Sequence, residues 1–289
     1  MNLEQAFSLR SQLFVPALSA RFIDKAHERG ADAIIVDLED AIAPTAKREA
    51  RQALPDVVRR ITAQGAPVFV RINNDPALLQ EDLEAALATP LAGIFLPKAE
   101  DPAQVHAVAE RTRKAGTGLV LLLETPPAVL RAAELTACDP ETVIGVVFGS
   151  EDYANALGVV PTIESMWYAA HAVALAARAH GRAAWGVVGS LAEFGDLALL
   201  GKMASSARYA GYTGALAIHP TQVPVLNEAF GASAQELHEA AAIVAAFEQA
   251  LKQGLGAVQH RGRMLDKPIV DRARRLLDLA RRRAERSTA

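Results

Sequence analysis

The chain has 289 residues, and its 30 Lys+Arg against 33 Asp+Glu give a formal net charge of −3. This near-neutral balance offers no long-range attraction for nucleic acid or for an anionic membrane, and we predict neither as a partner. The single cysteine, Cys138, excludes an internal disulfide. Together with a start that lacks a basic and then apolar signal pattern, it leads us to expect a cytoplasmic protein.

Short apolar runs alternate with amphipathic segments along the chain. The runs are nearly continuous in hydrophobicity, which is typical of parallel strands buried on both faces. They cover residues 12–15, 33–37, 67–71, 93–97, 118–124, 143–149, 184–188 and 215–219. Helical spacing predicts helices at 21–29, 45–63, 102–115, 128–137 and 164–180. Gly30, Gly65, Gly116 and Gly181 follow predicted helix ends, where a left-handed residue is favoured.

Eight strands that alternate with helices predict an α/β fold of the (β/α)₈ TIM barrel type over residues 1–222. An open doubly wound sheet is the alternative, but no glycine-rich phosphate motif follows the first strand. Residues 223–289 exceed what a barrel needs, and they contain predicted helices near 234–252 and 266–283. We interpret them as a C-terminal helical extension, or lid, that covers a barrel or packs on a neighbouring subunit.

Polar side chains follow the predicted strands, where barrel enzymes carry their chemistry. Glu124 and Asp152 follow adjacent strands and can approach one octahedral ion, since Mg²⁺ takes one or two protein carboxylates. No His or Cys accompanies them, which disfavours zinc. In the alternative interpretation, Glu124 caps the helix that starts near Pro126 and Asp152 caps the next helix.

Two basic residues also stand at strand ends. The planar guanidinium of Arg71 suits a substrate carboxylate, or it pairs with Asp37 or Glu39 across the rim, and both interpretations can hold together. The acidic run 37–40 could contact metal-bound waters or only pair with Arg71. Lys98 could form a Schiff base, but nothing beside it supports one, and we favour an ion pair at the rim.

The strand-end motifs together resemble the HpcH/HpaI aldolase and citrate lyase family, in particular its citrate lyase beta-subunit-like branch with malyl-CoA and citramalyl-CoA lyases. The resemblance covers about nine tenths of the chain. It rests on Arg10-Ser11-x-Leu13-Phe14-Val15-Pro16, Asp37-Leu38-Glu39-Asp40-Ala41, Val70-Arg71-Ile72-Asn73, Leu96-Pro97-Lys98-x-Glu100, Glu124-Thr125-Pro126, Gly149-Ser150-Glu151-Asp152, Ala217-Ile218-His219-Pro220 and Gly262-x-Met264-Leu265-Asp266-x-Pro268.

This resemblance implies a (β/α)₈ barrel with a divalent metal, usually Mg²⁺ with Mn²⁺ as the alternative. It makes Glu124 and Asp152 the metal ligands. By the same resemblance, Arg71 holds the carboxylate or carbonyl end of the cleaved acid, and Phe14 and Ser150 belong to the substrate-binding residues.

The remaining catalytic residues are also implied by the resemblance. Asp37 and Glu39 match acidic residues near the metal waters. Asp266 matches a carboxylate that the C-terminal segment carries to the active site of a neighbouring subunit, where it serves as a general acid and base. The family accordingly implies a homo-oligomer, a trimer or a hexamer.

The sequence departs from the family pattern in three places. Ala17 replaces the glycine after the first strand, and Gly186 stands near the position of a usual aspartate at the end of the seventh strand. Residues 211–215 replace a segment that in the family usually reads Gly-x-Asp-Gly-Lys, and Ala215 stands at the position of its lysine. We expect the last two changes to lie beside the thioester carrier, so they bear on the choice of carrier and acyl group.

The implied reaction is a Mg²⁺-dependent cleavage, or the reverse condensation, of a 3-hydroxyacyl-CoA such as malyl-, citramalyl- or citryl-CoA. The products are an acyl-CoA and a 2-keto acid, and the enzyme is a carbon–carbon lyase. Alternatives are a thioesterase on the same compounds, an aldolase on free keto acid and aldehyde, and a non-catalytic barrel in a larger complex. A citrate lyase subunit would need an acyl carrier protein as partner, which nothing in the sequence indicates.

Overall fold

The structure, a computed structural model, describes residues 1–288. The chain divides into two compact units, Met1–Phe230 and Gly231–Ala289. The first unit ends after helix α11 (Gln222–Ala229), which lies beyond the boundary expected after residue 222.

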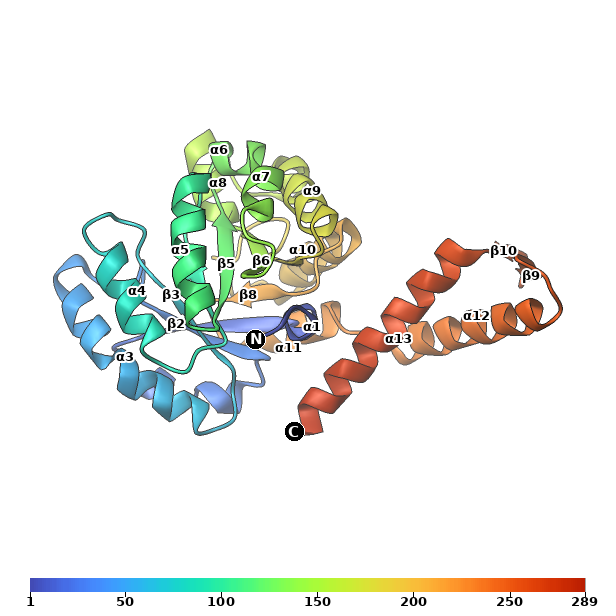
Figure 1. The fold of residues 1–289 in the computed structure, drawn as a ribbon, viewed down its shortest axis with the longest axis horizontal. Helices are drawn as coiled ribbons and strands as arrows, with labels where there is room; N and C mark the ends of the chain where they lie inside the picture. Colours follow the sequence, from blue (N-terminus) through green and yellow to red (C-terminus); the bar gives the residue numbers. More distant parts are fainter. Residues whose placement is uncertain (289) are drawn as a thin grey trace. The chain divides into compact units, whose positions relative to one another are not determined.

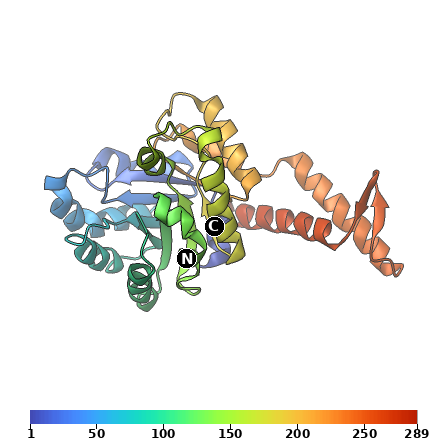
Figure 2. The ribbon, with the colours of Figure 1, turned by 90° about the horizontal axis from the view of Figure 1, so that it is seen from above.

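Parallel strands form the centre of the first unit (Figures 1 and 2). Within the described residues the sheet has eight strands in the order β7-β6-β5-β4-β3-β2-β1-β8. A bridge between Trp185 and Gly214 connects β7 to the segment just before β8, so the sheet closes on itself and the predicted (β/α)₈ barrel is confirmed. The strands are β1 Ser11–Pro16, β2 Ala33–Asp37, β3 Val68–Arg71, β4 Gly93–Leu96, β5 Gly118–Leu123, β6 Val143–Phe148, β7 Ala183–Trp185 and β8 Ala215–Ala217.

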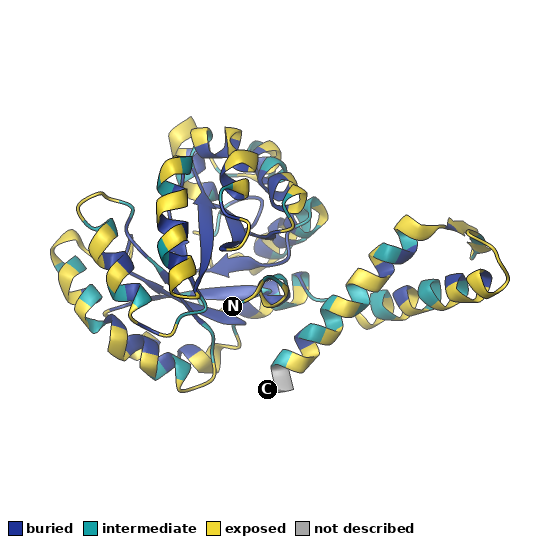
Figure 3. Cartoon of the chain, viewed as in Figure 1, coloured by how far each residue is buried: buried dark blue, intermediate teal, exposed yellow. Residues whose placement is uncertain are grey.

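Helices surround the barrel and expose their outer faces (Figure 3). Predicted helix 21–29 is a short α-helix followed by a 3₁₀ turn, and predicted helix 128–137 is broken at Arg131. The sequence pattern missed α1, α4, α10 and α11. Besides α11, the elements are α1 Leu3–Ser8, α2 Ala20–Asp24, η1 Ala26–Arg29, η2 Pro44–Ala46, α3 Lys47–Thr62, α4 Leu79–Leu87, α5 Pro102–Lys114, α6 Pro126–Leu130, α7 Ala132–Ala137, α8 Ser150–Leu157, α9 Ile163–Ala179 and α10 Leu197–Ala210.

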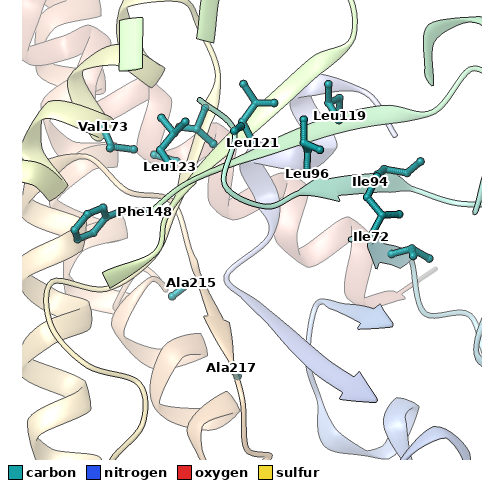
Figure 4. Packing of buried hydrophobic residues seen from close by; sticks show 14 of the residues in the cluster. Ile72, Ile94, Leu96, Leu119, Leu121, Leu123, Phe148, Val173, Ala215 and Ala217 are labelled. Atoms are coloured by element: carbon teal, nitrogen blue, oxygen red, sulfur yellow. The ribbon is translucent and has the colours of Figure 1, made fainter. Parts of the chain in front are cut away.

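Each strand divides its side chains between two apolar layers, because successive residues point to opposite faces. One layer lies between the strands and the helices, and Figure 4 shows part of it, including Leu121 and Leu123 of β5. The other fills the barrel, where the rings of Phe69 and Phe95 meet edge to face with centroids 5.3 Å apart. Trp185 completes this centre and is fully buried.

The second unit is a helical hairpin with a small antiparallel ribbon. Helix α12 (Ala234–Lys252) is capped by Ser233, whose hydroxyl accepts the backbone N–H of Glu236 at 3.1 Å. Strands β9 (Val258–His260) and β10 (Arg263–Leu265) pair before helix α13 (Lys267–Thr288). Helices α12 and α13 pack against each other within this unit. No helix in residues 1–288 is both long and apolar enough to span a membrane.

Candidate active site

Strand periodicity places three of the predicted site residues above the barrel interior. Asp37 and Arg71 follow Ile35 and Phe69 by two positions, and both of these residues fill the barrel. Glu124 follows the interior residue Leu122 in the same way. Because all strands are parallel, these side chains stand at the same end of the barrel, the end at which barrel enzymes carry their chemistry.

Asp37 and Arg71 are register partners on β2 and β3, and their side chains form a buried bidentate ion pair. Arg71 donates from Nε to Oδ1 of Asp37 at 2.8 Å and from Nη2 to Oδ2 at 2.7 Å. The backbone N–H groups of Glu39 and Ala41 donate to the same carboxylate. Burial opposes ionisation of Asp37, but the hydrogen bonds and charge of Arg71, with these two N–H groups, lower its pKa.

The other edge of the Arg71 guanidinium faces two more carboxylates. Nη1 lies 2.8 Å from Oε2 of Glu39 and 3.3 Å from Oδ2 of Asp40. The guanidinium carbon stands 4.7 Å from the ring centroid of Phe14, an arrangement that favours a cation over the aromatic face. The predicted ion pair of Arg71 with Asp37 and Glu39 is therefore present at the rim. The ring of Phe14 packs against the guanidinium of this arginine.

Glu124 is a buried carboxylate, only 5% exposed, directly after β5. Its Oε1 accepts the backbone N–H of Lys98 at 2.8 Å. Burial, and then the negative charges of Glu39 and Asp152, raise the pKa of Glu124 to about 8 against the opposing effect of that N–H group. Glu124 does not cap the next helix, because the hydroxyl of Thr125 accepts the N–H of Ala128 there.

Gly149 makes room for Glu124. A Cβ atom at this position would lie 2.4 Å from Cβ of Glu124 and 2.6 Å from its Oε2, closer than real Cβ atoms approach. Gly149 is also the residue that precedes helix α8, so Asp152 lies in the first turn of α8 and is not its cap. The capping interpretation is therefore wrong for both carboxylates. Ser150, the first residue of α8, is buried and lies two positions before Asp152.

Lys98 joins these groups into one cluster. Its ammonium lies 3.0 Å from Oε1 of Glu39 and 3.5 Å from Oδ2 of Asp152, as the predicted rim ion pair requires. Burial favours the neutral amine, but the hydrogen bond to Glu39 and the charges of Glu39, Asp152 and Glu124 outweigh it and raise the pKa of Lys98. A lysine held in its protonated form is a poor nucleophile, which disfavours a Schiff base.

The donor set at this rim suits a hard divalent cation. Glu124 and Asp152 offer carboxylate oxygens, and the raised pKa of Glu124 shows a buried carboxylate without enough positive charge around it. Among residues 1–288, no group of three or more His, Cys, Asp and Glu side chains is arranged to hold a metal. Two carboxylates nevertheless match Mg²⁺, which completes its shell with water and substrate oxygens.

A second polar network beneath the rim was not predicted from the sequence. The ammonium of Lys47 donates to the carbonyls of Leu38 and Glu39 and to Oδ1 of Asn73, at 2.9, 2.6 and 2.8 Å. The buried carboxylate of Asp82 accepts both the backbone and the side-chain N–H of Asn73. This network holds the segment that carries Asp37 and Glu39. Asn73 could have been identified as a member of this network, because it is a polar residue that follows a buried strand. Lys47 and Asp82 lie in helices, where no such position in the sequence marks them.

A cavity of about 420 Å³ opens beside the cluster. It is lined by Glu39, Asn73, Asn74, Asp75, Lys98 and Glu100. The cavity gives a small polar ligand room next to the carboxylates of the rim.

The predicted departures from the family pattern have different surroundings. Gly186 follows β7 with φ of 144°, and a Cβ there would lie 3.1 Å from the carbonyl oxygen of Phe148, so a larger residue would be strained. Ala215 is fully buried and begins β8, at the end of the strand opposite the rim. The expectation that Ala215 lies beside a thioester carrier is therefore wrong. Ala17 is also buried, and its N–H donates to the carbonyl of Asp37.

Asp266 belongs to the C-terminal unit, between β10 and α13. Its side chain is exposed, and Oδ1 accepts the backbone N–H of Ile269 at 3.4 Å, which places it at the start of the helix. The catalytic role expected for Asp266 thus concerns a residue outside the barrel unit.

A parallel barrel that carries a carboxylate-rich rim and a half-buried arginine at its strand ends has the architecture of barrel enzymes. The family model described as HpcH/HpaI aldolase/citrate lyase matches residues 10–220, and the chain belongs to this family. The resemblance identified from the strand-end motifs is therefore confirmed, and with it the prediction of an enzyme of the citrate lyase type, at the level of the family.

Three similar proteins cover nearly the whole chain. A citrate lyase subunit beta-like protein of Deinococcus radiodurans is 37% identical over 93% of this chain and 96% of its own. A (3S)-malyl-CoA thioesterase of Cereibacter sphaeroides is 33% identical over 94% of this chain and 95% of its own. The crystal structure of protein CitE from Mycobacterium tuberculosis, in complex with magnesium, acetoacetate and coenzyme A, has a TM-score of 0.76 at 30% identity, over 93% of this chain and 97% of its own.

Proposed function

We propose that the protein is a Mg²⁺-dependent carbon–carbon lyase that cleaves a 3-hydroxyacyl-CoA into an acyl-CoA and a 2-keto acid, or catalyses the reverse condensation. The observation that carries this proposal is the contact cluster in which Lys98 touches Glu39, Glu124 and Asp152, while Glu39 touches Arg71. The similarity to a protein that binds magnesium, acetoacetate and coenzyme A supports the choice of metal and substrate class.

In this proposal Glu124 and Asp152 hold the metal. Bound Mg²⁺ would supply Lewis acidity toward the oxygen of the 2-keto acid. Arg71 binds the carboxylate of the keto acid, and the exposed Asp40 is the partner that this carboxylate replaces at Nη1. Asp37 holds the guanidinium in place from its opposite edge. Phe14, under the same guanidinium, limits its movement and the access of water.

After cleavage the acyl-CoA product must take up a proton, and this proton needs a donor other than the residues assigned above. We assign this role to Asp266 of a neighbouring copy, so the active enzyme is a homo-oligomer, a trimer or a hexamer. The charge distribution supports the assignment, because the barrel unit carries 19 Lys+Arg against 26 Asp+Glu, and the C-terminal unit 11 against 7. Opposite net charges favour the docking of one unit on the barrel of another copy.

The test is an assay of keto-acid release from malyl-, citramalyl- and citryl-CoA with Mg²⁺. Wild type should cleave at least one of the compounds. Asp152→Ala should fold as wild type does and be inactive. Asp266→Ala should bind Mg²⁺ as wild type does and turn over more slowly. Glu110→Ala, on the exposed face of α5, is a matched control that should leave activity unchanged. If wild type and Asp152→Ala are equally inactive on all three compounds, lyase activity on these substrates is excluded.

The similarity to a malyl-CoA thioesterase favours one second candidate, hydrolysis of the same thioesters. A lyase releases keto acid without free thiol, whereas a thioesterase releases free CoA without keto acid. Parallel keto-acid and thiol assays on one reaction mixture therefore distinguish the two.

A further inference from the structure

Lys98 has a backbone conformation that lysine rarely adopts. Its φ is 47°, in the left-handed region, and of the non-glycine residues in the described part of the chain only Arg261 shares this property. Such strain persists where surrounding contacts enforce it, and it gathers at functional sites. The contacts are present here: Nδ2 of Asn74 donates to the carbonyls of Pro97 and Lys98 at 2.8 and 3.1 Å, and Gln104 in turn donates to Asn74.

This conformation lets one residue contact both candidate metal ligands. The backbone N–H of Lys98 donates to Oε1 of Glu124 at 2.8 Å, and its ammonium reaches Asp152 at 3.5 Å. The shorter contact of the ammonium is with Glu39, at 3.0 Å. The ammonium is thus shared between a carboxylate that the proposed metal would use and one that it would not.

We propose that Lys98 is a built-in counter-cation of the metal site. It neutralises Asp152 in the metal-free protein, gives Asp152 up to the incoming divalent cation, and is then retained by Glu39. The proposal rests on the assignment of Glu124 and Asp152 as metal ligands, and it adds a residue that sets metal affinity. In this arrangement Glu39 keeps its ion pair with the Lys98 ammonium after the metal has displaced that ammonium from Asp152. This role explains why the buried carboxylate of Glu39 lies beside the site.

Two substitutions test this role with effects of opposite sign. Lys98→Met keeps the length of the side chain and removes the competing charge, so Mg²⁺ should bind about tenfold more tightly, a conservative value for one unit charge at this distance. Without Mg²⁺ the variant should unfold at a lower temperature than wild type, and saturating Mg²⁺ should remove the difference. Glu39→Gln leaves the ammonium to Asp152 alone and should weaken Mg²⁺ binding.

Isothermal titration of metal-free protein with MgCl₂, with thermal unfolding in parallel, gives both readouts without any substrate. The double variant Lys98→Met/Glu39→Gln should bind Mg²⁺ more tightly than Glu39→Gln alone, because the competitor is gone. Lys98→Asn is a second charge-free variant whose side chain suits the left-handed backbone. Lys114→Met, which removes an exposed lysine paired with Glu110 on α5, is the control and should match wild type.

Unchanged or weaker Mg²⁺ binding in both Lys98→Met and Lys98→Asn would overturn the proposal, as would tighter binding in Glu39→Gln. A wild-type protein that binds no Mg²⁺ would overturn it together with the metal assignment. A protein that shows the expected affinities and cleaves none of the three thioesters would lose the proposed lyase function and keep this role for Lys98.

Discussion

Asp37→Asn should destabilise the protein, because it removes the buried negative charge that faces Arg71. The Asp37 carboxylate is 2% exposed and accepts four hydrogen bonds, two from Arg71 and two from backbone N–H groups. An asparagine places an NH₂ group against two of these donors. Breaking a buried ion pair costs about 3–5 kcal/mol. We expect Asp37→Asn to lower the free energy of unfolding by about 3 kcal/mol. The loss lies at the lower end of the range because Glu39 still pairs with the guanidinium at its other edge.

The matched control is Asp40→Asn, which removes a carboxylate from the same arginine at the surface. Asp40 is 64% exposed and lies 3.3 Å from Nη1, so its contribution should be about 0–1 kcal/mol. Urea unfolding followed by circular dichroism measures both variants. Equal destabilisation by the two substitutions, or a loss below about 1 kcal/mol for Asp37→Asn, would refute this account of the buried pair.

The same pair predicts a pH dependence with a definite sign. The pKa of Asp37 in the folded protein lies below its ordinary value of 3.8. The ionised carboxylate therefore stabilises the fold fully above that value, and this stabilisation is lost as the pH falls below it. Between about pH 4 and pH 2, wild type should lose more stability than Asp37→Asn, which has no carboxyl group to protonate.

Three further predictions concern other parts of the barrel. Gln12 is fully buried, and both polar atoms of its amide lack a hydrogen-bond partner among the described residues, so Gln12→Met should stabilise the fold by about 1 kcal/mol in urea unfolding; a destabilised variant would contradict this. Gly149→Ala should displace Glu124 and reduce both metal binding and activity. Gly201→Ala in α10 should preserve both, because a Cβ there would make only an ordinary contact, 3.8 Å from Cγ1 of Val225. Burial raises the pKa of the Cys138 thiol, so it should react with iodoacetamide at pH 7.5 more slowly than free cysteine, and alkylation at an equal rate would contradict this.

The strands were predictable from the sequence, and the first six of them end within one residue of the expected position, whereas β7 and β8 end earlier than expected. Parallel strands inside a barrel are apolar on both faces, so a charged residue after such a run has only the rim to occupy. This reasoning places Asp37, Arg71 and Glu124 correctly at the rim. Helices α4 and α10 were not predicted, although their apolar periodicity is at least as strong as that of the predicted helix α9.

Local pattern alone could not decide between competing roles for the rim residues. A carboxylate before a helix can cap it, and only the structure shows that Thr125 caps α6 and that Gly149 precedes α8, which leaves Glu124 and Asp152 free of that task. Likewise, a lysine after a strand has many uses. The contacts of Lys98 with two carboxylates depend on its left-handed backbone, which a single-residue pattern does not reveal.

The sequence by itself determined the barrel, the family and the set of polar residues at the rim, because strand period and motif order are local properties of the chain. The tertiary structure decided which charges meet. The pairing of Asp37 with Arg71 follows from the register of β2 with β3, and the sharing of Lys98 between Glu39 and Asp152 follows from the convergence of β2, β4 and α8. Electrostatic interactions fall with distance in space and with exposure to water, so the spacing of residues along the chain cannot supply them.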